Sequence, residues 1–163
     1  MRRLYCAYGS NLNLDQMKER SPMATVVCPL TLNDTSIVYK GVEGQVWATL
    51  QKDVGRSTPV LIWDIHEMDE EELDEYEMVP FYYRKEIIEL EINGETEDVL
   101  IYLMQEGYEY GLPNDLYFKG IQDGYRHHDF DLDILDYSIN LTLKHIRQQF
   151  NEKPSQEWEG FFL

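Results

Sequence analysis

Along the first two-thirds of the chain, short apolar runs with a period of two predict a series of β-strands. The first, from Leu4 to Tyr8, ends at Gly9-Ser10-Asn11. Strands rich in β-branched and aromatic residues are then expected at 25–32, 36–39, 44–51 and 59–65, separated by Gly, Asp, Asn or Pro. Residues 82–92 and 95–104 flank Asn93-Gly94, which is typical of a two-residue hairpin turn.

Helical periodicity is confined to shorter stretches and to the end of the chain. Asn13 is expected to cap a helix over 14–20, Asp69 a helix reaching Tyr76, and Asn114 a third helix. The last predicted helix has apolar residues three or four positions apart: Leu132, Leu135, Ile139, Leu143, Ile146 and Phe150. Many short strands with helices inserted and appended predict an α+β domain on a strongly curved or closed sheet.

Size and charge limit the possible functions. The 163 residues fit one domain, expected at 1–153, followed by a short C-terminal tail at 154–163. A formal net charge of −17 argues against binding to nucleic acid or to anionic membranes. No stretch approaches the ~18 apolar residues of a membrane span, and the N-terminus lacks the apolar run of a signal peptide. We therefore expect a cytoplasmic protein, with Cys6 and Cys28 as reduced thiols.

The sequence lacks the motifs of most cofactor-dependent, metal-dependent and covalent chemistries. There is no Walker loop, Gly-x-Gly-x-x-Gly, Cys-x-x-Cys or His-Glu-x-x-His motif, and Ser10 is not in a Gly-x-Ser-x-Gly elbow. The four histidines have no metal-ligand spacing: His66, His127, His128 and His145. If the protein is an enzyme, we expect it to use neither cofactor nor metal.

Two segments have the composition of a site. In Tyr8-Gly9-Ser10-Asn11-Leu12, glycine permits a sharp turn, and successive N–H groups at a helix start form an anion site; an ordinary capped turn is the other interpretation. The second segment contains Glu77, at a helix end before an apolar turn, with Asp74 one turn earlier. Burial and the nearby like charge of Asp74 are expected to raise the pKa of Glu77. A solvated acidic helix face is the alternative.

Together the two segments resemble the γ-glutamylcyclotransferase-like family, which has an N-terminal Tyr-Gly-Ser-Asn-Leu and a later Leu-Asp-x-x-Glu before an aromatic turn and a Tyr. Further matches are Arg20-Ser21-Pro22-Met23-Ala24, Gly44 to Leu50, and Pro113 to Tyr117. In the family, Gly usually follows the Glu, whereas this chain has Met78. The resemblance implies a small closed β-barrel flanked by helices.

It also implies a reaction: cyclisation of a small-molecule γ-glutamyl compound to 5-oxoproline with release of an amine. Glu77 would be the general base and acid, residues 8–12 would bind substrate, and Tyr83 and Tyr117 would hydrogen bond at the pocket wall. The leaving group and the oligomeric state stay open. The alternatives are a non-catalytic member that binds a small molecule or a protein, and a hydrolase using Ser10.

Overall fold

Two long antiparallel strands dominate the computed structural model, which describes residues 2–152. β2 (Thr25–Val42) and β3 (Gln45–His66) pair along nearly their whole length. The four short strands predicted between 25 and 65 are therefore two strands of one hairpin. The breaks predicted within each strand coincide with an irregularity in the ladder between Asn33 and Thr35, and a second irregularity, between Val26 and Cys28, lies inside the first predicted strand. Such bulges bend and twist a strand without ending it, and polar residues at a bulge look like a turn in the sequence.

The hairpin is part of a six-stranded mixed sheet with the order β4-β5-β1-β3-β2-β6. Its other strands are β1 (Arg2–Ala7), β4 (Tyr83–Ile92), β5 (Glu95–Met104) and β6 (Glu109–Tyr110). β1 pairs antiparallel with β3 and parallel with β5, which places the N-terminal strand in the middle of the sheet. The predicted turn at Asn93-Gly94 is confirmed, and both residues have the positive φ of this hairpin type.

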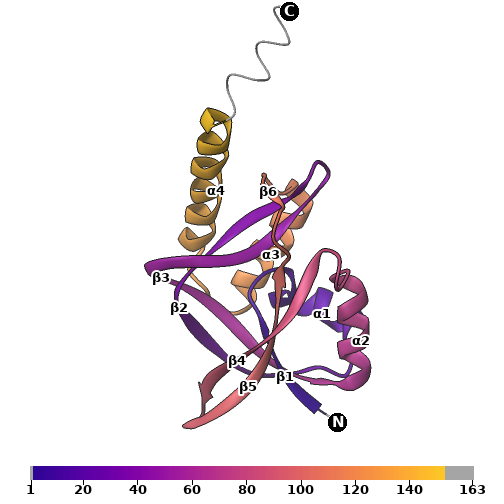
Figure 1. The fold of residues 1–163 in the computed structure, drawn as a ribbon. Coiled ribbons are helices and arrows are strands. Elements are labelled where there is room, and N and C mark those ends of the chain that lie inside the picture. The colour runs from indigo at the N-terminus through magenta and orange to yellow at the C-terminus, as the bar shows by residue number, and fades with distance from the viewer. Residues whose placement is uncertain (1, 153–163) are drawn as a thin grey trace, which may run out of the picture.

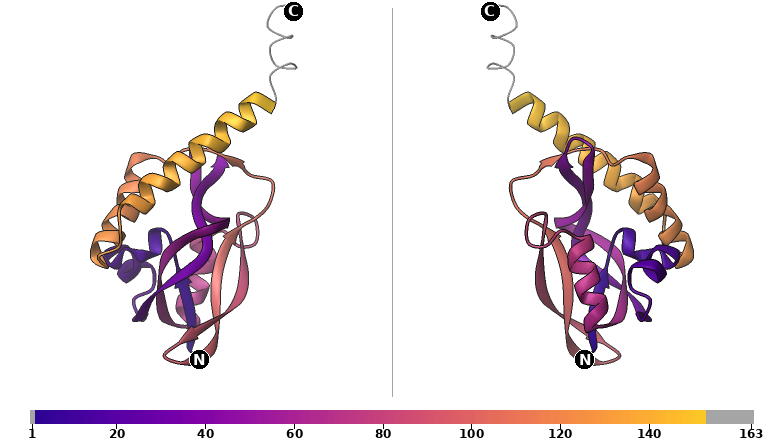
Figure 2. Two further views of the ribbon diagram at one scale, coloured as in Figure 1. Left: turned by 90° about the vertical axis from the view of Figure 1, so that its left-hand side faces the viewer. Right: turned by 90° about the vertical axis from the view of Figure 1, so that its right-hand side faces the viewer.

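The sheet curls into a half-barrel with helices around it, as Figures 1 and 2 show. This confirms the predicted α+β architecture. The helices are α1 (Leu14–Arg20), α2 (Glu67–Tyr76), α3 (Asp115–His127) and α4 (Asp133–Glu152), together with the 3-10 turn η1 (Ser10–Leu12). The first part of α4 packs on β2, and its C-terminal end extends away from the sheet (Figure 1). The expected tail at 154–163 lies outside the described residues.

The helix caps agree with the sequence at two of three starts. The side chains of Asn13 and Asn114 accept backbone N–H groups in the first turns of α1 and α3, as predicted. At α2 the prediction is wrong by three residues. His66 is the N-cap, and Asp69 supplies the returning side chain of the capping box by accepting the N–H of His66. Among residues 2–152, no helix is both long enough and apolar enough to cross a bilayer.

A glycine in α3 sets how closely this helix approaches η1. A β-carbon at Gly124 would lie 2.9 Å from Cβ of Leu12, closer than side chains normally pack. Leu12 is completely buried against this surface. The 3-10 turn that follows β1 therefore packs directly on α3.

Candidate active site

Glu77 is positioned by the way in which α2 ends. It is the C-cap residue of the helix, and Met78 after it has a φ of 54°. The N–H of Val79 donates to the carbonyl of Asp74, and that of Met78 to the carbonyl of Glu75. This pair of bonds is the Schellman motif, in which the residue after the cap takes the left-handed conformation that glycine adopts most easily. The Gly expected from the family at position 78 therefore has a structural reason, and Met78 occupies the same conformation.

The loop after β1 is held in place through Asn11. The carbonyl of Asn11 accepts the indole N–H of Trp63 at 3.1 Å, and its side-chain Oδ1 accepts Arg20 Nη1 at 2.7 Å. Its Nδ2 donates to the hydroxyl of Tyr5 at 2.8 Å and lies 3.4 Å from Oε1 of Glu77. Asn11 is only 3 % exposed, so this network brings the loop and the end of α2 together out of bulk water.

The loop retains unused backbone donors. Within the described part of the chain, the N–H groups of Gly9, Ser10 and Asn11 donate to no protein acceptor. The N–H of Leu12 does, since it bonds to the carbonyl of Gly9. The sequence predicted donors from Gly9 to Leu12, and the structure leaves the first three of them available for an anion.

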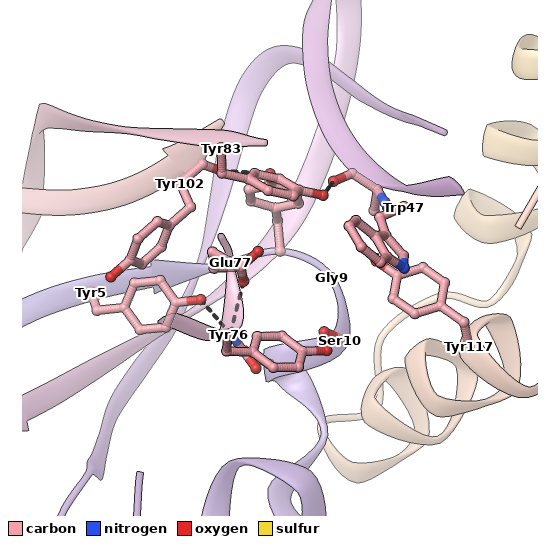
Figure 3. Close-up of a pocket in the computed structure, with 12 residues that line it drawn as sticks. Tyr5, Gly9, Ser10, Trp47, Tyr76, Glu77, Tyr83, Tyr102 and Tyr117 are labelled. Carbon is pink, nitrogen blue, oxygen red and sulfur yellow. Dashed lines mark hydrogen bonds between the residues drawn. The ribbon is translucent and has the colours of Figure 1, made fainter. Parts of the chain in front are cut away.

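The loop and Glu77 line one cavity, of about 100 Å³, which is drawn in Figure 3. Glu77 points inward between the tyrosine rings, opposite the backbone at Gly9 (Figure 3). Seven of the eight residues predicted for the site line this cavity: Tyr8, Gly9, Ser10, Asn11, Glu77, Tyr83 and Tyr117. The eighth, Leu12, does not. It packs in the core instead, because the 3-10 turn directs it toward α3.

Five further residues line the cavity without having been predicted: Tyr5, Trp47, Ala48, Tyr76 and Tyr102. Trp47 and Ala48 lie in a segment that matched the family, but nothing in it distinguishes a cavity wall from a core strand. The high tyrosine content, 12 in the chain, was the available signal. Tyrosine is the residue that can line a buried polar pocket with an apolar ring and a hydrogen-bonding tip.

The tyrosine hydroxyls differ in what they can offer a ligand. Tyr83 donates to the carbonyl of Ala48 at 2.6 Å, and Tyr8 donates to the carbonyl of Tyr102 at 2.6 Å, so both protons are in use. Tyr117 instead accepts the N–H of Ala48 at 3.0 Å. Since an N–H only donates, Tyr117 keeps its own proton for another acceptor.

Tyr5 is in the same position as Tyr117, because its hydroxyl accepts Nδ2 of Asn11. Burial raises the pKa of both hydroxyls above the ordinary value, and negative charge on Glu77 raises it further. Tyr5 and Tyr117 are therefore neutral donors facing the cavity.

Burial determines the protonation of Glu77. Removal of the carboxyl from water raises its pKa from 4.5 to about 7, and the positive charge of Arg20 acts in the opposite direction. A carboxyl with this pKa can both accept and return a proton near neutral pH.

The predicted contribution of Asp74 to this pKa is wrong. Its carboxylate lies 2.9 Å from Nζ of Lys85 and accepts the hydroxyl of Tyr102 at 2.6 Å. The side chain is thus paired on the β4–β5 side of α2, and burial alone accounts for the raised pKa of Glu77.

No group of three or more His, Cys, Asp or Glu side chains with metal-binding geometry occurs among residues 2–152. In the cavity, Glu77 is the acidic residue and there is no histidine. The arrangement can hold an anion at the loop N–H groups and exchange a proton with a group that lies between the loop and Glu77.

Comparison with solved structures identifies the fold. A structure described as a γ-glutamyl cyclotransferase has a TM-score of 0.73 at 24 % identity, with 84 % of this chain and 86 % of the other covered. An uncharacterized protein from Homo sapiens has a TM-score of 0.72 at 26 % identity, with 83 % and 85 % covered. YkqA from Bacillus subtilis has a TM-score of 0.65 at 20 % identity, with 77 % of this chain and 49 % of YkqA covered.

A search of curated proteins finds no match. The family described as "Gamma-glutamyl cyclotransferase, AIG2-like" matches residues 5–124, a range that begins in β1 and ends in α3. This range contains all of the residues that line the cavity. The chain therefore belongs to the AIG2-like γ-glutamyl cyclotransferase family.

Proposed function

We propose that this protein cyclises a γ-glutamyl compound to 5-oxoproline and releases an amine, with Glu77 as the general base and acid. The observation that carries the proposal is the placement of one carboxyl with a pKa of about 7 in a cavity, across from a loop with three unused backbone N–H groups. Family membership supports the reaction class.

The cavity suits the γ-glutamyl part of such a substrate. Its α-carboxylate, or the oxyanion that develops on the γ-carbonyl, can accept the N–H groups of Gly9, Ser10 and Asn11. The hydroxyl protons of Tyr5 and Tyr117 are further donors. The α-ammonium is the group that Glu77 attracts. A cavity of about 100 Å³ leaves the amine leaving group at the mouth.

The chemistry needs only proton transfers from the protein. Glu77 removes a proton from the α-ammonium, and the free amine attacks the γ-carbonyl carbon to form a five-membered ring. Glu77 then protonates the departing nitrogen, and the C–N bond of the amide breaks. A second proton passes from the lactam nitrogen to the leaving amine by the same route, so no net proton is released. Because the nucleophile is part of the substrate, much of the entropic barrier is already removed.

The test is replacement of Glu77 by Gln, with Glu75→Gln as the matched control on the exposed side of the same helix. Each change removes one carboxylate near the C-terminal end of α2. Loss of a general acid–base residue typically lowers the rate by about 10²–10⁴-fold. We expect that loss in kcat for Glu77→Gln and an unchanged rate for Glu75→Gln. The product 5-oxoproline is measured by mass spectrometry over a panel of γ-glutamyl amino acids, γ-glutamylamines and glutathione. Turnover by Glu77→Gln at the wild-type rate would refute the role.

The alternative is a binding protein of the same fold. It predicts that the wild-type protein binds 5-oxoproline or a γ-glutamyl compound in calorimetry and produces no 5-oxoproline from any member of the panel. A Ser10 hydrolase is disfavoured, because Oγ of Ser10 accepts Arg20 at 3.3 Å and no histidine lines the cavity to activate it.

A further inference from the structure

Arg20 lies outside the cavity and contacts residues that line it. It is the last residue of α1, is partly buried, and is not among the residues that line the cavity. Its Nη1 lies 2.7 Å from Oδ1 of Asn11 and 3.3 Å from Oγ of Ser10, and its Cζ lies 3.8 Å from the ring centroid of Tyr76. All three partners line the cavity, so Arg20 contacts the wall at three points without entering it.

The contact with Asn11 fixes which way the amide faces. A guanidinium has only donors, so the amide atom that it meets must be the oxygen. The NH₂ group of Asn11 then faces Tyr5 and Oε1 of Glu77, at 2.8 and 3.4 Å. If the amide were rotated by 180°, Arg20 would face an NH₂ group and the carboxylate of Glu77 would face an oxygen. Both contacts would then be repulsive.

We propose that Arg20 is a positioning residue that orients the Asn11 amide as a donor to Glu77 and so favours the ionised form of the general base. The assignment of Glu77 as a base rests on the proposed function. The orientation of the amide and its effect on the ionisation of the carboxyl are independent of the proposed function.

The electrostatic surroundings of Glu77 support this role. Burial raises its pKa to about 7, and Arg20 is the positive charge that lowers it. The groups that line the cavity with Glu77 from the other elements are neutral hydroxyls and one amide: Tyr5 and Tyr8 from β1 and its end, Ser10 and Asn11 from η1, Tyr83 from β4, Tyr117 from α3, and Tyr102 from β5, whose hydroxyl donates to Asp74. On its own helix, the ring of Tyr76 lines the cavity, while Asp74 is paired with Lys85.

Two groups oppose the rise in the pKa of Glu77 that burial causes: the positive charge of Arg20 and the NH₂ group of Asn11. Both depend on Arg20, because Arg20 also sets the orientation of the Asn11 amide. Lys85, which lies on β4, is paired with Glu70 and Asp74. Loss of Arg20 removes the charge and also frees the amide to rotate, and either change favours the protonated, inactive carboxyl.

The experiment compares three variants with the wild-type protein. Arg20→Met keeps an unbranched chain over the ring of Tyr76 but has no charge and no donor. Arg20→Lys keeps the charge and one donor group. Arg126→Met removes an exposed arginine that pairs with Asp123 on α3 and is the matched control for loss of a positive charge.

The first measurement is the titration of the Glu77 carboxyl, followed by NMR in protein labelled with ¹³C at the glutamate carboxyl and assigned by its absence in Glu77→Gln. An opposite charge within a few ångströms typically lowers the pKa of a carboxyl by about 1 unit or more. We expect the midpoint to rise by about one pH unit in Arg20→Met, to rise less in Arg20→Lys, and to stay in place in Arg126→Met. An unmoved midpoint in a folded Arg20→Met variant overturns the proposal, as does a rise of equal size in Arg126→Met.

The second measurement is the pH dependence of kcat/KM. We expect Arg20→Met to lose about tenfold at pH 6 and to approach the wild-type value at pH 9, where the carboxyl is ionised without help. A purely structural role for Arg20 predicts an equal loss at all pH values, which would overturn the proposal. If the wild-type protein shows no cyclisation but the NMR midpoint moves as expected, the proposed function fails and the positioning role stands. Should Arg20→Met not fold, Arg20→Lys carries the test, with a smaller rise expected.

Discussion

Replacement of Glu77 by Gln should change the pH dependence of protein stability as well as the rate. In the folded protein, burial raises the pKa of Glu77 from 4.5 to about 7, whereas in the unfolded chain the carboxyl has its ordinary value. Between these two values the folded state binds more protons than the unfolded state. The wild-type protein therefore loses stability as the pH rises from about 4.5 through about 7. The Gln variant has no carboxyl at this position and lacks this contribution.

The size of the effect follows from the pKa. At about 1.4 kcal/mol per pKa unit, a rise from 4.5 to about 7 corresponds to roughly 3 kcal/mol of unfolding free energy once the carboxyl is fully ionised. Part of the Glu77 residue is still accessible to solvent, which reduces the effect of burial, so this free energy is an upper bound. Below pH 4.5 the carboxyl is neutral in both states, and the contribution vanishes.

The assay is urea unfolding of both proteins at pH 5 and pH 8. The difference in unfolding free energy, Glu77→Gln minus wild type, should become more positive by roughly 2–3 kcal/mol between the two pH values. Every other titrating group is common to both proteins and cancels in the difference. Glu75→Gln, on the same helix but exposed, should show a difference that hardly changes with pH.

Two results would refute the reasoning. If the Glu77→Gln difference is the same at pH 5 and pH 8, the carboxyl is not buried in the folded protein. A difference that becomes more negative toward pH 8 would mean that the ionised carboxylate is stabilised by a positive charge to an extent that exceeds its burial.

Two further substitutions test the surroundings of Glu77. Asp74→Asn should leave the acidic limb of the kcat/KM profile in place and lower the unfolding free energy by about 1–3 kcal/mol. The reason is that Asp74 is paired with Lys85 and Tyr102 and not with Glu77. An acidic limb that moves to lower pH in this variant would restore Asp74 as a cause of the raised pKa of Glu77. Met78→Gly should stabilise the protein by about 0.5–1 kcal/mol with unchanged activity, since the residue has a φ of 54° and its side chain is 42 % exposed. A chemical unfolding midpoint at or below that of the wild type would show that position 78 carries no strain.

Sequence reasoning found both segments that line the cavity, because each depends on local structure. A strand that ends in Gly9-Ser10-Asn11 and a helix that ends at Glu77 can be recognised within about ten residues of sequence. Local rules also predicted the Asn93-Gly94 turn and the Asn13 and Asn114 caps.

What local rules missed were interactions between distant segments. The long β2–β3 hairpin was divided into short strands because the polar residues at its bulge resemble those of a turn. Asp74 was assigned to Glu77 because residues three apart share a helix face. In the structure, Lys85 and Tyr102 reach Asp74 from the neighbouring strands, and nothing in the local sequence indicates this. For the same reason Arg20 was noted as a match to the family but not assigned a role.

The electrostatic design of the site follows from where its single carboxyl lies. A carboxylate in water has too low a pKa to take a proton from an ammonium efficiently, and one in a fully apolar cavity would stay protonated. Here burial raises the pKa of Glu77 to about 7, and Arg20, acting from behind the loop, prevents a larger rise. A substrate ammonium placed beside Glu77 would favour the ionised form further. In the proposed reaction the substrate ammonium would thus help to ionise the carboxyl that deprotonates it, while the N–H groups of Gly9, Ser10 and Asn11 would bind the negative end of the substrate.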